Sequence, residues 1–210
     1  MTPEALGHLN QVEAAVQEAK RLLARHGYLD DRRTVIVIGF IDQIIEHHES
    51  MLLLLRNGKT GSAFALARSV VEGMYRGMWI NFVATDVQIE RFERTDEIGL
   101  NMTELACAID AGYHAEDFFK DLKRRSWDAL NSYTHTGMLQ LGRRFREHNV
   151  EPSYTEAQIV EISTAVTTCV LLLVGKFLAV QNHADECRAA EALVGTYGPA
   201  RQAMQQPEAH

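Results

Sequence analysis

Proline is scarce in this chain of 210 residues: it occurs four times, at positions 3, 152, 199 and 207. Nearly 150 residues pass between the first proline and the second. Because proline breaks the interior of a helix, its absence over such a length favours long helices joined by short turns.

Cysteine is scarce too, and Cys107, Cys169 and Cys187 are odd in number and far apart. This pattern excludes a small disulfide scaffold and favours free thiols in a reducing cytoplasm. The first residues lack the basic and apolar regions of a signal peptide. The longest apolar run, residues 169–180, is interrupted by Lys176 and falls short of the ~20 residues of a membrane span. We therefore expect a cytoplasmic protein without a membrane partner.

Apolar residues recur at spacings of three and four along most of the chain, which is the period of an amphipathic helix. The β-branched stretch 34–38 belongs to such a pattern, so we predict a helix there and not a strand. Ser153 and Glu156 have the spacing of a capping box and predict the start of a long apolar helix. Helices are expected near 9–26, 34–56, 60–84, 86–98, 102–111, 115–135 and 137–148, and the helix that Ser153 opens has apolar residues from Ile159 to Phe177 on its inward side. We predict an all-α antiparallel bundle without a sheet over residues 1–184, followed by a final helix and a loose tail over 185–210.

The segment 60–84 has the features of a central helix. An apolar stripe through Phe64, Val71 and Met78 covers one side, and small residues (Ser62, Ser69, Gly73 and Gly77) cover the opposite side. Another helix can approach the small side closely, which favours a homodimer packed through it. Arg68, Glu72 and Arg76 step by four along the flank and predict a paired, largely buried ladder of charges. That ladder is either a structural ion network or the wall of a ligand-binding groove.

His48 lies on the apolar seam of the segment 34–56, where a hydrogen-bonded core histidine is expected. The neighbouring Glu46-His-His-Glu49 run raises the possibility of a metal site. Di-iron bundles, however, use Glu-x-x-His pairs, and the sequence contains none. We therefore predict neither a metal site nor a cofactor.

A second polar region follows Trp127. Asn131 and His135 lie four residues apart on one helical flank, with Tyr133 between them. A helix that ends at Thr136 leaves His135 at its C-terminus, where the macrodipole favours the protonated imidazole. His135 is either a capping residue at a helix break or a functional group.

Basic residues gather near this region although the whole chain has a formal charge of −7. Such an island on an acidic protein suits an anion such as RNA phosphate, with solvated surface charge as the alternative. Its members are Lys120, Lys123, Arg124, Arg125, Arg143, Arg144 and Arg146.

Two stretches carry a resemblance to a known group of proteins. They are Gly61-Ser-Ala-Phe-Ala-Leu-Ala-Arg68-Ser-Val-Val-Glu72, continuing to Trp79, and Trp127-Asp-Ala-Leu-Asn-Ser-Tyr-Thr-His135-Thr-Gly137. Together they resemble uncharacterised bacterial helical proteins related to the HEPN superfamily. The resemblance implies a dimeric helical fold and a metal-independent ribonuclease of toxin–antitoxin or phage-defence systems, with an antitoxin as a possible partner.

The signature of the HEPN superfamily is an arginine followed after four to six residues by a histidine. Arg21 with His26 and Arg143 with His148 match it literally, and the second pair lies in the basic island. Closer relatives resemble the present chain at a Ser/Thr-rich helix end that carries a histidine, as in residues 132–135.

These observations are consistent with three hypotheses for the function: an enzyme, a binding module and a purely structural helical dimer. In the enzyme, a histidine acts as general acid or base and an arginine stabilises the phosphorane formed when the 2′-hydroxyl attacks. The candidate catalytic residues are His135, Arg68, Glu72, Arg143 and His148. The candidate binding residues are Arg76, Asn131, Tyr133, Arg144, Arg146, Lys123, Arg124 and Arg125. In the binding module, the groove beside Arg68, Glu72 and Arg76 holds a nucleotide, a peptide or a partner protein.

Overall fold

A computed structural model of the chain describes residues 1–28, 30–146 and 149–197. The helices are α1 (Pro3–Leu23), α2 (Arg32–Arg56), α3 (Thr60–Met78), α4 (Asp86–Thr95), α5 (Met102–Tyr113), α6 (Phe118–Thr134), α7 (Met138–Gly142), α8 (Glu156–Val180) and α9 (Ala184–Tyr197). The turn η1 (Trp79–Val83) is π-helical, and β1 (Phe145–Arg146) pairs with β2 (Asn149–Val150) in a small hairpin.

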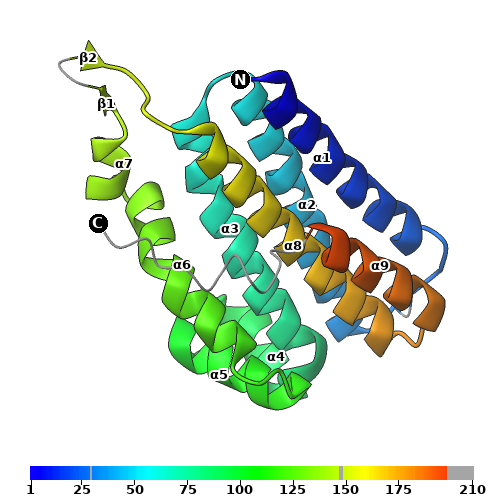
Figure 1. Cartoon of the computed structure of the whole chain (residues 1–210). Coiled ribbons are helices and arrows are strands. Elements are labelled where there is room, and N and C mark those ends of the chain that lie inside the picture. The colour runs from blue at the N-terminus through cyan, green and yellow to red at the C-terminus, as the bar shows by residue number, and fades with distance from the viewer. Residues whose placement is uncertain (29, 147–148, 198–210) are drawn as a thin grey trace.

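The long helices α1, α2, α3 and α8 run side by side, and α6 lies against α3 on the other side (Figure 1). The predicted all-α architecture is confirmed. Among the described residues, the hairpin of β1 and β2 is the one β element, and with two residues in each strand it adds no layer to the bundle. The segment 34–38 is helical as predicted, because Asp31 caps α2 by accepting a hydrogen bond from the Thr34 amide at 3.1 Å.

Helix α3 is central, as its sequence predicted. A Cβ on Gly73 would lie 2.5 Å from Ile44 Cγ2 of α2, and one on Gly77 would lie 2.7 Å from Leu173 Cδ2 of α8. The small side of α3 therefore accepts two helices of the same chain. A homodimer has to use another face than the one the sequence suggested, and dimerisation itself stays a prediction.

Three predicted details at helix ends are wrong. The cap of α8 is Thr155 with Gln158, and Glu156 instead accepts hydrogen bonds from the backbone and hydroxyl of Thr2, both at 2.6 Å. The helix expected over 60–84 ends at Met78, where the chain widens into the π-helical turn η1 and Phe82 lies exposed at the surface. The expected helix 137–148 is only the five-residue α7 followed by the hairpin.

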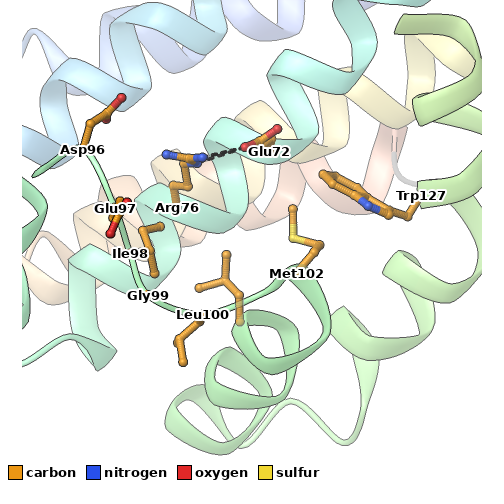
Figure 2. A pocket seen from close by; sticks show the side chains of 10 residues that line it. Glu72, Arg76, Asp96, Glu97, Ile98, Gly99, Leu100, Met102 and Trp127 are labelled. Atoms are coloured by element: carbon orange, nitrogen blue, oxygen red, sulfur yellow. Dashed lines mark hydrogen bonds and ion pairs between the residues drawn. The ribbon is translucent and has the colours of Figure 1, made fainter. Parts of the chain in front are cut away.

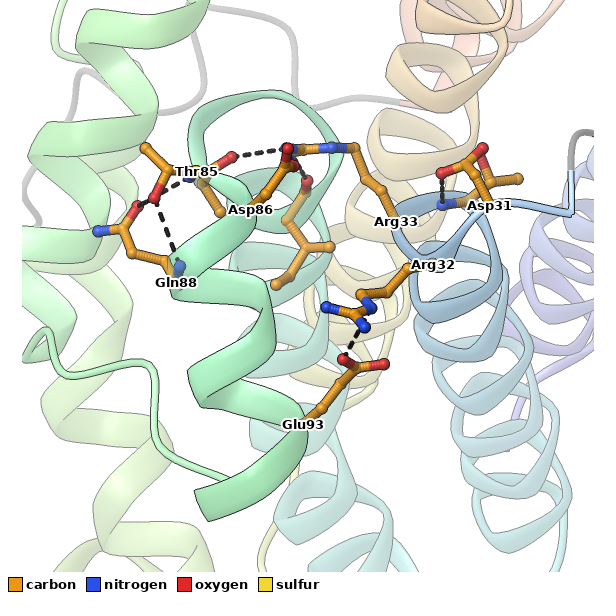
Figure 3. Close-up of polar contacts among 10 residues, drawn as sticks. Asp31, Arg32, Arg33, Thr85, Asp86, Gln88 and Glu93 are labelled. Atoms are coloured by element: carbon orange, nitrogen blue, oxygen red, sulfur yellow. Dashed lines mark hydrogen bonds and ion pairs between the residues drawn. The ribbon is translucent and has the colours of Figure 1, made fainter.

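Arginines at the start of α2 fix the position of α4 (Figure 3). Arg33 donates to the carbonyl oxygens of Ile80 and Ala84 at 2.5 and 2.8 Å, which are backbone acceptors at and just after the π-helical turn. It also pairs with Asp86 at 3.2 Å, and Arg32 pairs with Glu93 at 3.1 Å. The loop that follows α4 therefore has a defined place beside α3.

Helix α8 is long and apolar enough, by length and composition, to cross a membrane, but 67% of its apolar window is buried in the bundle. Burial of this kind is typical of the core helix of a folded domain. Helix α9 packs on α8 and α1 and buries Ala190. The part of the expected tail at 198–210 lies outside the described residues.

His48 is a buried core histidine, as predicted. Its Nε2 lies 2.8 Å from Thr167 Oγ1 of α8, and burial lowers the pKa of the imidazole to about 4.

Candidate functional site

The end of α6 meets the flank of α3 through a contact between Arg68 and His135, which are 67 residues apart in the chain. Arg68 Nη1 is hydrogen-bonded to His135 Nε2. Because a guanidinium has donors but no acceptor, His135 Nε2 must carry a lone pair, so the ring proton is on Nδ1. The sequence suggested that the helix end favours the protonated imidazole, whereas this contact requires the neutral ring.

The same guanidinium is held from two further sides. It lies over the ring of Trp127, 5.0 Å from the ring centroid, which is cation–π geometry. Its Nη2 is 3.5 Å from Glu72 Oε2, and Glu72 Oε1 accepts from Arg76 Nη2 at 2.7 Å. The predicted ladder of Arg68, Glu72 and Arg76 is therefore confirmed. Its burial is partial, since the side chains of Arg68 and Glu72 are 21% and 27% exposed. We call Arg68, Glu72, Arg76, Trp127 and His135 the arginine–histidine cluster.

A tight turn places His135 beside α3. The turn is a Schellman motif in which the Gly137 amide donates to the Ser132 carbonyl at 2.7 Å. Thr136 occupies its left-handed position with φ +53°, where a β-branched residue is strained. A Cβ on Gly137 would lie 2.4 Å from Ser132 Oγ and 2.9 Å from Ser132 Cα, so only glycine fits this position. The two readings of His135 are therefore compatible, because it ends α6 and also contacts Arg68.

Two buried polar atoms near this contact have no hydrogen-bond partner within the described part of the chain. They are the donor Nε of Arg68 and the acceptor Oδ1 of Asn131, which lies one helical turn before His135. Buried polar groups are rarely left unpaired, so these atoms are places for a bound water or ligand.

A cavity of about 410 Å³ adjoins the cluster and shares Glu72, Arg76 and Trp127 with it (Figure 2). The loop between α4 and α5 forms one wall, with Asp96, Glu97, Ile98, Gly99 and Leu100, and α5 adds Met102 and Leu105. Glu97 pairs with Arg91 at 3.3 Å, whereas Asp96 has no ion pair among the described residues. Sequence reasoning missed this loop, because its residues form no motif and reach α3 only through the placement of α4.

The basic island is spread over several surfaces. On α6, Lys120 pairs with Asp117 at 2.8 Å and Arg124 pairs with Asp121 at 3.0 Å. Lys123 is half-buried, and Arg125 is exposed at a position about 160° around the helix from Trp127.

The remaining candidate residues lie near the start of α3. Arg143 donates to the Ser153 carbonyl at 3.5 Å, and the Arg144 guanidinium lies over Gly61 and beside Tyr154. Tyr133 packs against Phe64 and Tyr154, with ring centroids 5.1 and 6.4 Å away, and not on the cluster.

Of the two pairs that match the HEPN signature literally, Arg21 with His26 lies outside the cluster. Arg21 pairs with Glu18, and His26 stacks on His183 with ring centroids 3.7 Å apart. Arg146 lies in β1, and His148 lies outside the described residues, so the pair of Arg143 and His148 stays a prediction. Within the described residues, no three His, Cys, Asp or Glu side chains converge on a possible metal ion.

The sequence profile of a family of unknown function, DUF6988, matches residues 41–193, a range that contains the whole cluster and the cavity. No curated protein matches the chain significantly. No solved structure matches it significantly either.

Proposed function

The chain belongs to the DUF6988 family, and we propose that its arginine–histidine cluster binds a phosphodiester of RNA and cleaves it. The observation that carries the proposal is the contact between Arg68 and His135. It brings a permanent cation and a titratable base together at the surface from two helices. These are the two groups that cleavage by an internal hydroxyl requires.

The tautomer of His135 determines its role in the proposed cleavage of RNA. His135 Nε2 has a lone pair and takes the proton of a ribose 2′-hydroxyl as its oxygen attacks the neighbouring phosphorus. Arg68 turns its Nη1 from the imidazole to the phosphorane and stabilises the added negative charge. The bond to the 5′-oxygen breaks, and that oxygen takes a proton from water. The products are a 2′,3′-cyclic phosphate and a 5′-hydroxyl.

Glu72 is a positioning residue in this proposal. Its carboxylate lies between Arg68 and Arg76 and keeps both guanidinium groups on one flank of α3. The indole of Trp127 covers a face of Arg68, so the free hydrogens of the guanidinium are directed along its edge, where a phosphate can accept them.

The wider role rests on the resemblance to HEPN-related proteins. The resemblance supports a cytoplasmic ribonuclease of a toxin–antitoxin or phage-defence system. The ribonuclease acts as a homodimer and is inhibited by an antitoxin. The exposed arginines of the basic island would attract RNA to the site over a distance.

A second candidate is a binding module without turnover. The cavity favours it, because Glu72 and Arg76 line a space large enough for a small ligand. In that module the cluster holds the phosphate of the ligand and His135 serves only as a hydrogen-bond partner.

The test incubates the purified protein with single-stranded RNA and transfer RNA at low salt. Cleavage should persist in EDTA, because the nucleophile is tethered to the phosphate and needs no metal-bound water. His135→Ala should abolish turnover but retain binding, since a general base acts on the barrier. His47→Ala, on α2 outside the cluster, is the matched control and should cleave normally.

Salt dependence tests the basic island separately. Replacing Arg143, Arg144 and Arg146 together should flatten the dependence of affinity on salt, because each neutralised phosphate releases counterions. Undiminished cleavage by His135→Ala would refute the assignment of the base. Cleavage that is lost in His148→Ala instead would move the site to Arg143 and His148. Binding without cleavage would select the second candidate.

A further inference from the structure

The cavity next to the cluster has a chemistry of its own. Glu72 and Trp127 line it (Figure 2) and also contact Arg68, so a ligand whose phosphate lies at Arg68 can place its next group there. Its volume of about 410 Å³ lies within the ~300–1,000 Å³ typical of sites for small ligands.

The charges of the lining exclude a second phosphate. Arg76 is the one basic residue among those that line the cavity, against three carboxylates. Glu72 pairs with Arg68 and Arg76, and Glu97 pairs with Arg91, which leaves Asp96 as the lining carboxylate without an ion pair among the described residues. A fitting group is therefore uncharged and donates hydrogen bonds to Asp96.

The remaining surface of the cavity suits a flat ring. Ile98, Leu100, Met102 and Leu105 supply apolar contacts, and Trp127 closes the end nearest to Arg68. Figure 2 shows the guanidinium of Arg76 between Glu72 and the loop that carries Asp96. Arg76 uses Nε and Nη2 on Glu72, so its Nη1 hydrogens are available to an acceptor on the ligand.

Guanine matches this combination among the four RNA bases. Its O6 and N7 atoms accept hydrogen bonds from an arginine, and its N1–H and N2–H groups form a donor pair that suits a carboxylate. Adenine, cytosine and uracil each lack at least one of these two pairs. We infer that the cavity is a guanine subsite, with Arg76 and Asp96 as the residues that select the base.

The inference rests on the proposed function, because the phosphate of the same nucleotide lies at Arg68 and His135. The nucleotide is either a guanosine within RNA or a free guanine nucleotide, which present the same base and phosphate. In RNA, only one base enters the cavity, and the phosphates of neighbouring nucleotides stay outside the acidic lining.

Tryptophan fluorescence reports occupancy without any need for catalysis. The chain has two tryptophans; Trp79 is only 1% exposed, whereas Trp127 lines the cavity. Guanosine and GMP should quench the emission, and AMP, CMP and UMP should bind at least tenfold more weakly. GMP should bind at least tenfold more tightly than guanosine, because only GMP reaches Arg68. In Trp127→Phe the quenching should disappear.

Asp96→Asn tests the selection of the base. It should reduce the preference for GMP over AMP at least fivefold, whereas Asp42→Asn, at an exposed aspartate of α2, should leave that preference unchanged. On RNA, mapped cleavage sites should lie next to guanosine in the original protein and lose this bias in Asp96→Asn, with cleavage itself retained.

The outcomes separate the two proposals. Quenching by GMP in a protein that leaves RNA intact supports the subsite, identifies a free guanine nucleotide as its ligand and refutes the ribonuclease. Cleavage of RNA without base preference and without quenching by guanosine refutes the subsite and retains the ribonuclease. Equal binding of the four nucleotides also refutes the subsite.

Discussion

Acidification should destabilise the fold through His48, a residue outside the cluster. The imidazole is fully buried between α2 and α8, and its Nδ1 has no hydrogen-bond partner among the described residues. Burial lowers its pKa from 6.5 to about 4, although the charges of Glu49 and Glu13 oppose the shift. Between these two pH values the unfolded chain takes up a proton that the folded chain does not accept.

The size of the effect follows from linkage. The free energy of unfolding falls as the pH falls wherever the unfolded state binds more protons, and each pH unit of such a difference is worth about 1.4 kcal/mol. Above pH 6.5 the imidazole is neutral in both states and costs nothing. The penalty grows to about 2 kcal/mol at pH 5 and to about 3 kcal/mol near pH 4, below which it stays constant.

Other groups also lose stability in acid, so the measurement has to be a difference between variants. The pKa values of Asp31, Glu49 and Glu186 are lowered by hydrogen bonds to Thr34, Lys20 and His26, and these carboxylates lose their stabilising contacts as they protonate. That loss is common to both proteins in the comparison.

The assay is urea unfolding of the original protein and of His48→Gln at pH 7.5, 6.5, 5.5 and 5. Glutamine keeps an N–H donor for Thr167 but does not titrate, so the stability of the variant relative to the original protein should improve by about 2 kcal/mol from pH 7.5 to pH 5. His47→Gln, at the next residue of the same helix, is the control and should show no such trend. Parallel pH profiles for the original protein and His48→Gln would refute the reasoning.

Three further variants test the packing around the cluster. Gly137→Ala forces a Cβ against the backbone of Ser132 and should cost about 1–3 kcal/mol in urea unfolding, whereas Gly142→Ala, with nothing within 4 Å, should cost nothing; equal stabilities would refute the tight turn. Thr136→Gly removes the strain of the left-handed backbone and should increase the free energy of unfolding by about 1 kcal/mol, which is measured as a higher melting temperature. Tyr75→Phe deletes a buried hydroxyl that donates to a backbone carbonyl at 2.6 Å and should cost about 1–2 kcal/mol; a loss below about 0.3 kcal/mol would show that the bond is unimportant.

Much of the fold could be predicted because the patterns that determine it lie within single helices. The periodicity of apolar residues determined the long helices and identified His48 as a core residue. The spacing of Arg68, Glu72 and Arg76 predicted their pairing, since residues four apart on a helix are neighbours whatever surrounds them. Gly73 and Gly77 predicted a close helix approach, which the structure shows with α2 and α8 as the partners.

The helix ends that differ from the prediction depend on which of several polar groups forms the cap in the folded chain. Both Ser153 with Glu156 and Thr155 with Gln158 can form a capping box, and Thr2 decides between them by binding the Glu156 carboxylate. Such a choice needs a residue that is 154 positions away, so the pattern around residue 153 could not reveal it. The π-helical turn after Met78 has no sequence signal of comparable strength.

The contact at the centre of the candidate site also could not be predicted from the sequence. The sequence supplied Arg68 on one helix and His135 on another, each with a structural and a functional interpretation. Their contact depends on how α6 crosses α3, and that crossing is set by buried contacts such as the hydroxyl of Tyr75 on the Phe119 carbonyl. The turn at Gly137 then fixes the end of α6 to within one residue, so that the last helical carbonyls are satisfied and the imidazole reaches the guanidinium. His135 thus ends α6 and is also the proposed base. It has both roles only because α3 packs against α6.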